Sequence, residues 1–140
     1  MRRLFAAALG LVLACVPAAA GAQTDEEAVP VFAGGGTNLT NGYFFPGTAT
    51  YDGEGFVGVP HQIQQGQNIL FVNTDVAAVT NSHTMISVRK NKKKRPFFHS
   101  GYVRGPASVT VKTSHLKPGV YPYYCSVHYG MYGLLEVTKI

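Results

Sequence analysis

The sequence contains little sulfur: its 140 residues include two cysteines and three methionines. Cys15 lies in an N-terminal apolar stretch, so Cys125 is alone in the rest of the chain. This excludes an internal disulfide from the part that follows the stretch. In an oxidising compartment a single thiol is vulnerable unless it is buried, catalytic or bound to a metal. Metal ligation would explain why Cys125 is present.

Long apolar runs are also lacking, because the longest one, residues 4–16, is shorter than the roughly 20 residues that a membrane span needs. It follows Arg2 and Arg3 and precedes Ala20-Gly21-Ala22, which is typical of a secretory signal peptide. We expect a signal peptide over residues 1–22 and cleavage before Gln23. The mature protein is then exported to the periplasm, the cell surface or the extracellular space, without a transmembrane span.

A second interpretation of this stretch remains open. Residues 12–15, Val-Leu-Ala-Cys, resemble a bacterial lipobox, in which Cys15 would carry a lipid anchor and become the mature N-terminus. Leu13 is bulky for that pattern.

No long segment has the helical period, and the chain is rich in residues of strands and turns, with 16 Gly, 8 Pro, 8 Tyr and 8 Phe. Its length suits one domain. We predict a flexible acidic tail over residues 23–30 and an all-β domain over 31–140. Expected strands include 31–33, 43–45, 69–73, 84–88, 108–112, 120–125 and 133–138, with 69–73 covered on both faces.

Charge is sparse and uneven. Removal of Arg2 and Arg3 leaves ten basic against seven acidic residues, a net charge of 10 − 7 = +3. Six of the basic residues lie within Arg89–Arg95. Such a run is either a solvated loop or a docking patch for an acidic partner or an anionic surface. We expect no nucleic-acid partner.

One short stretch near the C-terminus carries the chemistry. Cys125, His128 and Met131 have the spacing Cys-x2-His-x2-Met. A thiolate and a thioether are soft ligands, and with imidazoles they suit a copper ion in an electron-transfer site. The segment before Cys125 and the segment after Met131 both have strand character, so we predict a hairpin with His128 at the tip of its loop. A site on such a hairpin changes little between oxidation states.

The motif lacks a second histidine, which must come from elsewhere in the chain. We predict His83, because it precedes the apolar run that begins at Thr84. His61, His99 and His115 are the other histidines available.

These features resemble the cupredoxin family, the small blue copper proteins that include plastocyanin, amicyanin and pseudoazurin. The resemblance is carried by the apolar strand after Gly66, the loop ending in His83, the Pro118-Gly119-Val120-Tyr121 turn, Cys125 with its motif, and the strand after Gly133. It implies a two-sheet Greek-key β-sandwich that binds one type 1 copper ion. His83, Cys125 and His128 would be its equatorial ligands and Met131 its weak axial ligand.

The resemblance also implies contacts around the sulfur. The Thr84 N–H would donate to Cys125, and the Ser126 hydroxyl would connect the two ligand loops. The sequence departs from amicyanin and plastocyanin at Val127, where they usually carry proline. Valine retains an N–H that proline lacks, so it could supply a further donor to the sulfur.

The implied function is one-electron transfer between redox partner proteins by a monomer that is not an enzyme. A partner would dock on the apolar edge of His128, formed by Val127, Tyr129, Gly130 and Tyr132, or on the basic run; the two tyrosines could instead pack under the loop. Copper storage or delivery is the alternative, and a metal-free secreted β-sandwich is a third. The chain lacks the His-Cys-His sequence of multicopper oxidases and copper nitrite reductases and the paired cysteines of the binuclear copper centre.

Overall fold

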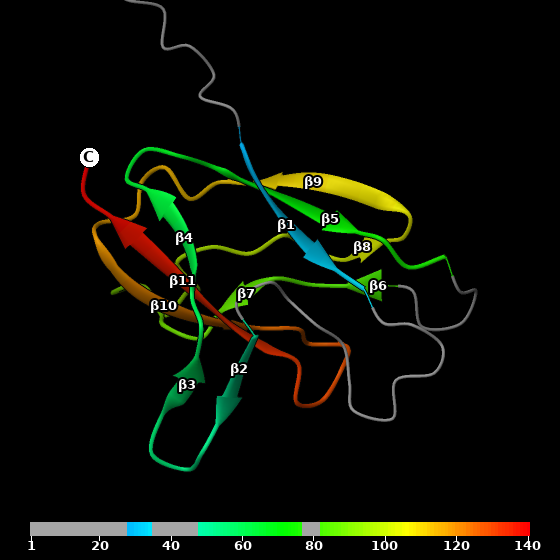
Figure 1. The fold of residues 1–140 in the computed structure, drawn as a ribbon, viewed down its shortest axis with the longest axis horizontal. Helices are drawn as coiled ribbons and strands as arrows, with labels where there is room; N and C mark the ends of the chain where they lie inside the picture. Colours follow the sequence, from blue (N-terminus) through cyan, green and yellow to red (C-terminus); the bar gives the residue numbers. More distant parts are fainter. Residues whose placement is uncertain (1–27, 35–47, 77–81) are drawn as a thin grey trace, which may run out of the picture.

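The computed structural model describes residues 28–34, 48–76 and 82–140. Within these ranges the chain forms eleven β-strands and no helix, which confirms the all-β class (Figure 1). Consequently these ranges contain no helix that could cross a membrane. The predicted signal peptide, Cys15, the acidic residues of the tail and the strand expected at 43–45 lie outside the described residues.

The larger sheet is built around β11 (Tyr132–Thr138), which pairs with the whole of β10 (Gly119–Tyr124) in an antiparallel hairpin. The other edge of β11 pairs with two shorter strands, β2 (Thr48–Tyr51) and β4 (His61–Gln64). The sheet is completed by β3 (Phe56–Gly58) beside β2 and by β7 (Ile86–Ser87) beside β10. The hairpin that carries the motif is therefore central in its sheet.

The smaller sheet contains β1 (Val29–Ala33), β5 (Ile69–Asn73) and β9 (Ala107–Val111), with β5 in the middle. β1 begins at Val29 rather than at residue 31, and it is an edge strand, where Pro30 can be accommodated. A short third sheet pairs β6 (Ser82–His83) with β8 (Val103–Arg104). The described chain thus has two principal sheets, as predicted, and a small additional one.

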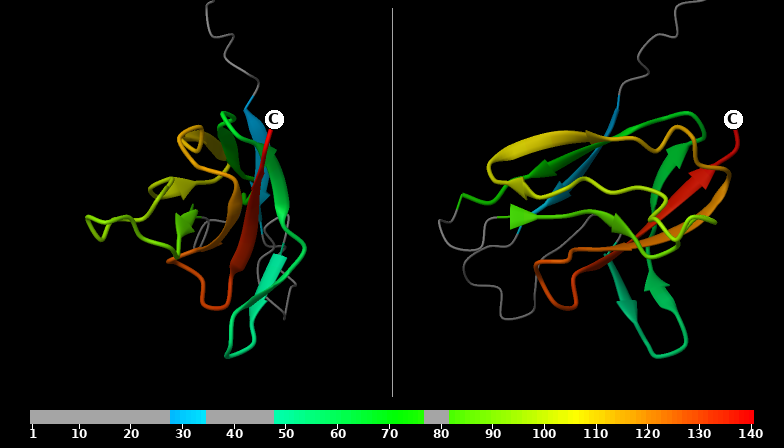
Figure 2. Two further views of the ribbon diagram at one scale, coloured as in Figure 1. Left: turned by 90° about the vertical axis from the view of Figure 1, so that its left-hand side faces the viewer. Right: turned by 180° about the vertical axis from the view of Figure 1, so that it is seen from behind.

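The hydrophobic core lies between the two principal sheets, which form the two layers seen edge-on in Figure 2. Ile69 and Phe71 point inward from β5, and Tyr123 and Leu135 point inward from the hairpin; all four are fully buried. The prediction that β5 is covered on both faces was wrong. Its alternate residues Leu70 and Val72 are only partly buried, since the outer face of this sheet is not covered as completely as the inner one.

The single strand expected at 84–88 is also wrong, because the structure has β6 before Thr84 and β7 after Met85. The Thr84 N–H donates to Cys125 Sγ over 3.4 Å, and the Met85 N–H donates to Ser100 Oγ over 2.9 Å. Both N–H groups are thus used by side chains instead of a neighbouring strand, which interrupts the ladder.

Candidate metal centre

The loop at residues 125–131, the ligand loop, joins β10 to β11, so that Cys125 directly follows one strand and Met131 directly precedes the other. The Cys125 N–H donates to the Met131 carbonyl over 3.0 Å and closes the base of the loop. Gly130 has a φ of 75°, a conformation that costs glycine little and other residues more. The predicted hairpin is therefore confirmed, with His128 in its loop.

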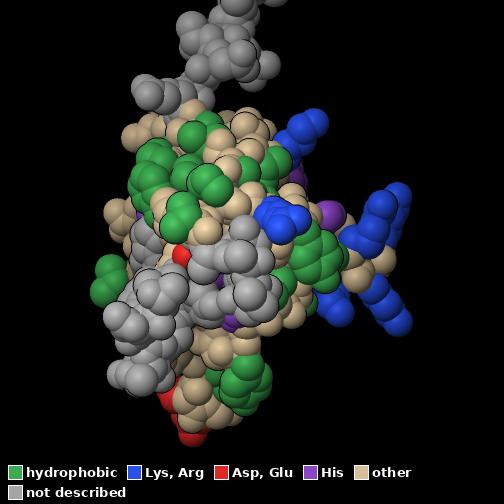
Figure 3. Space-filling view, turned by 90° about the vertical axis from the view of Figure 1, so that its right-hand side faces the viewer, with side chains coloured by type: hydrophobic (Ala, Val, Ile, Leu, Met, Phe, Trp, Pro, Cys, Tyr) green, Lys and Arg blue, Asp and Glu red, His purple; other side chains and the backbone are tan. Residues whose placement is uncertain are grey.

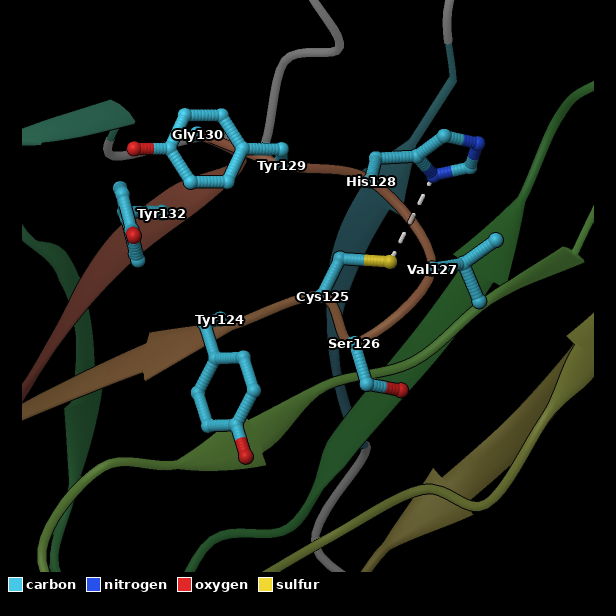
Figure 4. Close-up of a pocket in the computed structure, with 8 residues that line it drawn as sticks. All are labelled: Tyr124, Cys125, Ser126, Val127, His128, Tyr129, Gly130 and Tyr132. Carbon is cyan, nitrogen blue, oxygen red and sulfur yellow. Dashed lines mark hydrogen bonds between the residues drawn. The ribbon is translucent and has the colours of Figure 1, made fainter.

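The structure brings three predicted residues together. Cys125 Sγ lies 3.6 Å from His128 Nδ1 and 3.9 Å from His83 Nδ1. The three donor atoms lie within 4.8 Å of one another. Figure 4 shows the Cys125 sulfur and the His128 ring turned toward each other across the ligand loop. His83 reaches them from β6, where it is paired with Val103 of β8.

These distances fit a metal ion. An ion such as Zn²⁺ lies about 2.0–2.1 Å from an imidazole nitrogen and about 2.3 Å from a thiolate sulfur, so that in tetrahedral or trigonal geometry the two donors are about 3.6–3.8 Å apart. The two measured separations are close to this range. One thiolate and two imidazoles are also the donor set that suits copper.

The surroundings of Cys125 favour the thiolate form of its sulfur. Burial raises the pKa of the Cys125 thiol, but hydrogen bonds with His83, with the backbone N–H groups of Thr84 and Val127, and with His128 outweigh this effect and lower the pKa to about 6. Because a metal binds the thiolate, this environment favours the ligating form near neutral pH.

A hydroxyl pair joins the two segments that carry the ligands. Thr84 Oγ1 accepts a hydrogen bond from the Ser126 N–H over 2.8 Å and lies 3.1 Å from Ser126 Oγ. Together with the bond from the Thr84 N–H to Cys125 Sγ, it fixes the segment after His83 against the ligand loop. The structure confirms both contacts that the resemblance implied.

Sequence reasoning missed Asp75. His83 Nε2 donates to Asp75 Oδ2 over 2.8 Å, and the two side chains are 0% and 8% exposed. Burial lowers the pKa of His83, but hydrogen bonding and attraction from Cys125 and Asp75 raise it, and the net shift is upward. The available signal was an acidic residue in the loop that leads to His83, in a chain with few acidic residues.

The remaining candidates are Met131 and three other histidines. Met131 is 2% exposed and belongs to the same buried core as Cys125. Among the described residues, His61, His99 and His115 do not join the cluster. The ring of His99 accepts a bond from the Gly101 N–H, and the ring of His115 bonds the Phe97 carbonyl. His61 lies in β4, where burial lowers its pKa.

The outer side of the ligand loop is partly apolar. Tyr129 is fully exposed and Val127 is 40% exposed, whereas Tyr132 is half-buried and packs edge-on against Phe56. Residues 124–130 and Tyr132 surround an open depression (Figure 4). Tyr129 therefore does not pack under the loop, and Tyr132 packs against β3.

No protein-family model matches the sequence, and no curated protein matches it. One solved structure similar to this chain is the Cu-containing nitrite reductase (NirK) from Thermus scotoductus SA-01, with a TM-score of 0.44 and 21% sequence identity. The match covers 66% of this chain and 25% of the nitrite reductase chain.

Over residues 28–34, 48–76 and 82–140, the fold is all-β and one largely buried cluster joins a thiol with two imidazoles. In both respects the chain resembles the cupredoxins. One thiol and two imidazoles are a donor set that suits a copper ion.

Proposed function

We propose that this chain is an exported mononuclear type 1 copper protein that carries single electrons between redox partners. The observation that carries the proposal is the convergence of His83 Nδ1 and His128 Nδ1 on Cys125 Sγ in a buried place. These residues would be the equatorial ligands, and Met131, at the base of the same loop, would be the weak axial ligand. Bound copper supplies the redox chemistry by alternating between Cu(II) and Cu(I).

The protein residues hold the geometry. The central hairpin fixes Cys125 and Met131 through a backbone hydrogen bond, and Thr84 fixes the segment of His83 against the loop. A framework that is the same before and after electron transfer adds little reorganisation energy. The site therefore suits repeated one-electron transfer better than release of its ion.

We propose that electrons enter and leave through His128, because its loop is the part of the site nearest to solvent. His83 and Cys125 are buried, whereas His128 is partly exposed and flanked by the exposed side chains of Val127 and Tyr129. A small apolar surface around a ligand allows a partner to approach closely and to leave quickly.

The basic run would steer an acidic partner to the protein. Asn91 orders this turn by accepting bonds from the Lys93 and Arg95 N–H groups, and residues 92–95 are exposed. Arg89 ties the turn to the start of β10 by donating to the Val120 carbonyl over 3.0 Å, whereas the ligand loop follows the other end of β10. The basic run that would steer a partner and the ligand loop that carries His128 therefore lie near opposite ends of β10.

The proposal is tested by an absorption spectrum after Cu(II) loading. We expect an intense visible charge-transfer band and narrow copper hyperfine splitting, both of which require a thiolate ligand. Cys125→Ser should abolish the band and keep the fold, and His61→Ala is the matched control that should retain it. A colourless tight complex would instead support storage or delivery, and failure to bind copper would support a metal-free protein.

The non-enzymatic role needs its own measurement. The copper-loaded protein should accept and donate one electron per molecule in a stopped-flow experiment. With nitrite and an excess of reductant it should form no product beyond that given by free copper. Turnover of nitrite would contradict the carrier role.

Export is tested by the mass of the mature protein. Cleavage after Ala22 gives a chain that begins at Gln23. A chain that begins at Cys15 and carries acyl groups would establish a lipid anchor instead.

A further inference from the structure

We propose that Asp75 is a positioning residue of the metal centre: it orients His83 through Nε2–H and lowers the reduction potential of the bound copper. The inference rests on the proposed copper site. His83 Nε2 donates a hydrogen bond of 2.8 Å to Asp75 Oδ2, and the side chains of His83 and Asp75 are 0% and 8% exposed. A carboxylate behind a histidine ligand fixes the ring and raises its basicity as a ligand.

The position of Asp75 is fixed by its own surroundings. Its N–H donates to Asn73 Oδ1 over 2.9 Å, and Asn73 Nδ2 donates to the Val103 carbonyl over 2.8 Å. Val103 is the partner of His83 in the β6–β8 pair. The carboxylate and the ring that it contacts are therefore both anchored to the same short strand, β8.

Two glycines allow residues 73–75 to pack closely against the rest of the chain. A Cβ at Gly105 would collide with the Asp75 carbonyl and with the Asn73 side chain. A Cβ at Gly34 would collide with Thr74 Oγ1 and would lie 3.4 Å from Asp75 Oδ1. Gly105 thus lets the chain pack closely against the backbone of Asp75, and Gly34 lets it pack closely against the carboxylate.

The consequence for the metal follows from the chemistry of the two groups. A carboxylate is an acceptor, so Nε2 must hold the proton, and Nδ1 presents its lone pair on the side of Cys125. The carboxylate also places a negative charge in a poorly solvated position behind a ligand. This charge stabilises Cu(II) more than Cu(I), because the oxidised ion carries the larger positive charge.

Asp75→Asn is the decisive variant, since it keeps the size and an oxygen acceptor but removes the charge. Loss of such an outer partner typically costs about 10–100-fold in metal affinity. We expect at least a tenfold loss of Cu(II) affinity with little change for Cu(I), which raises the reduction potential by about 59 mV or more. Asp52→Asn, which removes an exposed carboxylate from the β2–β3 turn, is the matched control and should change neither quantity.

A second measurement does not depend on a variant. In the Cu(I)-loaded wild-type protein, which is diamagnetic, the His83 Nε2–H should give a slowly exchanging NMR resonance. Rapid exchange of this proton with water would overturn the proposal, and so would an unchanged potential in a folded Asp75→Asn variant that retains the visible band. Absence of that band from the wild type would overturn the copper proposal as well.

Discussion

Cys125 shows how a few hydrogen-bond donors favour the thiolate form of a buried thiol. Burial alone would keep its proton on, but the hydrogen bonds around the sulfur stabilise the thiolate more strongly. These donors come from His83, Thr84, Val127 and His128, which lie on two separate segments of the chain. The sulfur is therefore largely in the thiolate form, the form that a metal would bind, without any metal.

The thiolate should be observable in the metal-free protein. Its ultraviolet absorbance should titrate with a midpoint at about pH 6, and Cys125→Ser should remove the transition. Since the folded pKa lies below the ordinary value of about 8.5, the thiolate's contribution to stability is complete above about pH 8.5 and is lost as the pH falls through about 6. A midpoint near the ordinary value would contradict the described environment.

Val127 should tune the potential through its backbone. Its N–H is one of the donors that lower the pKa of Cys125. Removal of this donor in Val127→Pro should make the sulfur more electron-donating and favour Cu(II), so the variant should have a lower reduction potential than the wild type. Redox titration of Val127→Pro beside Val127→Ala, which keeps the N–H, measures the effect. An equal or higher potential in the proline variant would refute it.

At the scale of elements, the packing within the hairpin of β10 and β11 determines how the ligand loop is positioned. Tyr123 lies directly opposite Gly133 in this pair and is fully buried. A Cβ at Gly133 would collide with the phenol ring of Tyr123. Gly133 therefore allows the Tyr123 ring, the largest fully buried side chain of the described residues, to lie across β11. Tyr123 is two residues before Cys125, where the ligand loop begins.

Gly133→Ala should consequently destabilise the protein. Overpacking of this kind costs about 1–3 kcal/mol, which chemical denaturation of the metal-free protein would measure. Gly55→Ala, at a turn glycine where a Cβ would meet nothing within 4 Å, is the matched control and should have little effect. Equal stability of the two variants would mean that Tyr123 repacks freely.

At the scale of the whole molecule, basic and acidic side chains gather in different places on one face. Figure 3 shows Lys and Arg side chains projecting from one side and acidic side chains at one end of the molecule. Residues 92–95 supply exposed cations, and the β2–β3 turn carries Asp52 and Glu54. Such an arrangement orients an approaching charged partner before contact.

Neutralisation of the basic patch should slow association with an acidic redox partner. We expect Gln in place of Lys92, Lys93 and Lys94 to reduce the association rate at least about tenfold at low salt, with an unchanged reduction potential. Gln at Lys112, Lys117 and Lys139 removes the same charge from other exposed positions and is the control. Equal salt dependence for both triple variants and the wild type would exclude steering by this patch.

The local pattern of the sequence was sufficient to predict the hairpin and its loop. Cys125, His128 and Met131 are close in sequence, and the segments on either side of them have strand character, so a hairpin is the simplest connection between them. The same reasoning predicted β5, because the turn before it is marked by Gly66. These features depend on neighbours along the chain.

Only the tertiary structure decided how distant segments meet. His83 and Cys125 are separated by 42 positions, and their approach depends on the packing of β6 and the ligand loop, which no periodicity encodes. The same packing placed Asp75 behind His83 and diverted the N–H groups of Thr84 and Met85 from a strand ladder to side chains. The sequence by itself thus determined the ligand loop and named His83 as its distant partner. Only the packing of the sheets brought His83 and Asp75 to the loop, because side-chain contacts between remote segments exist only after folding.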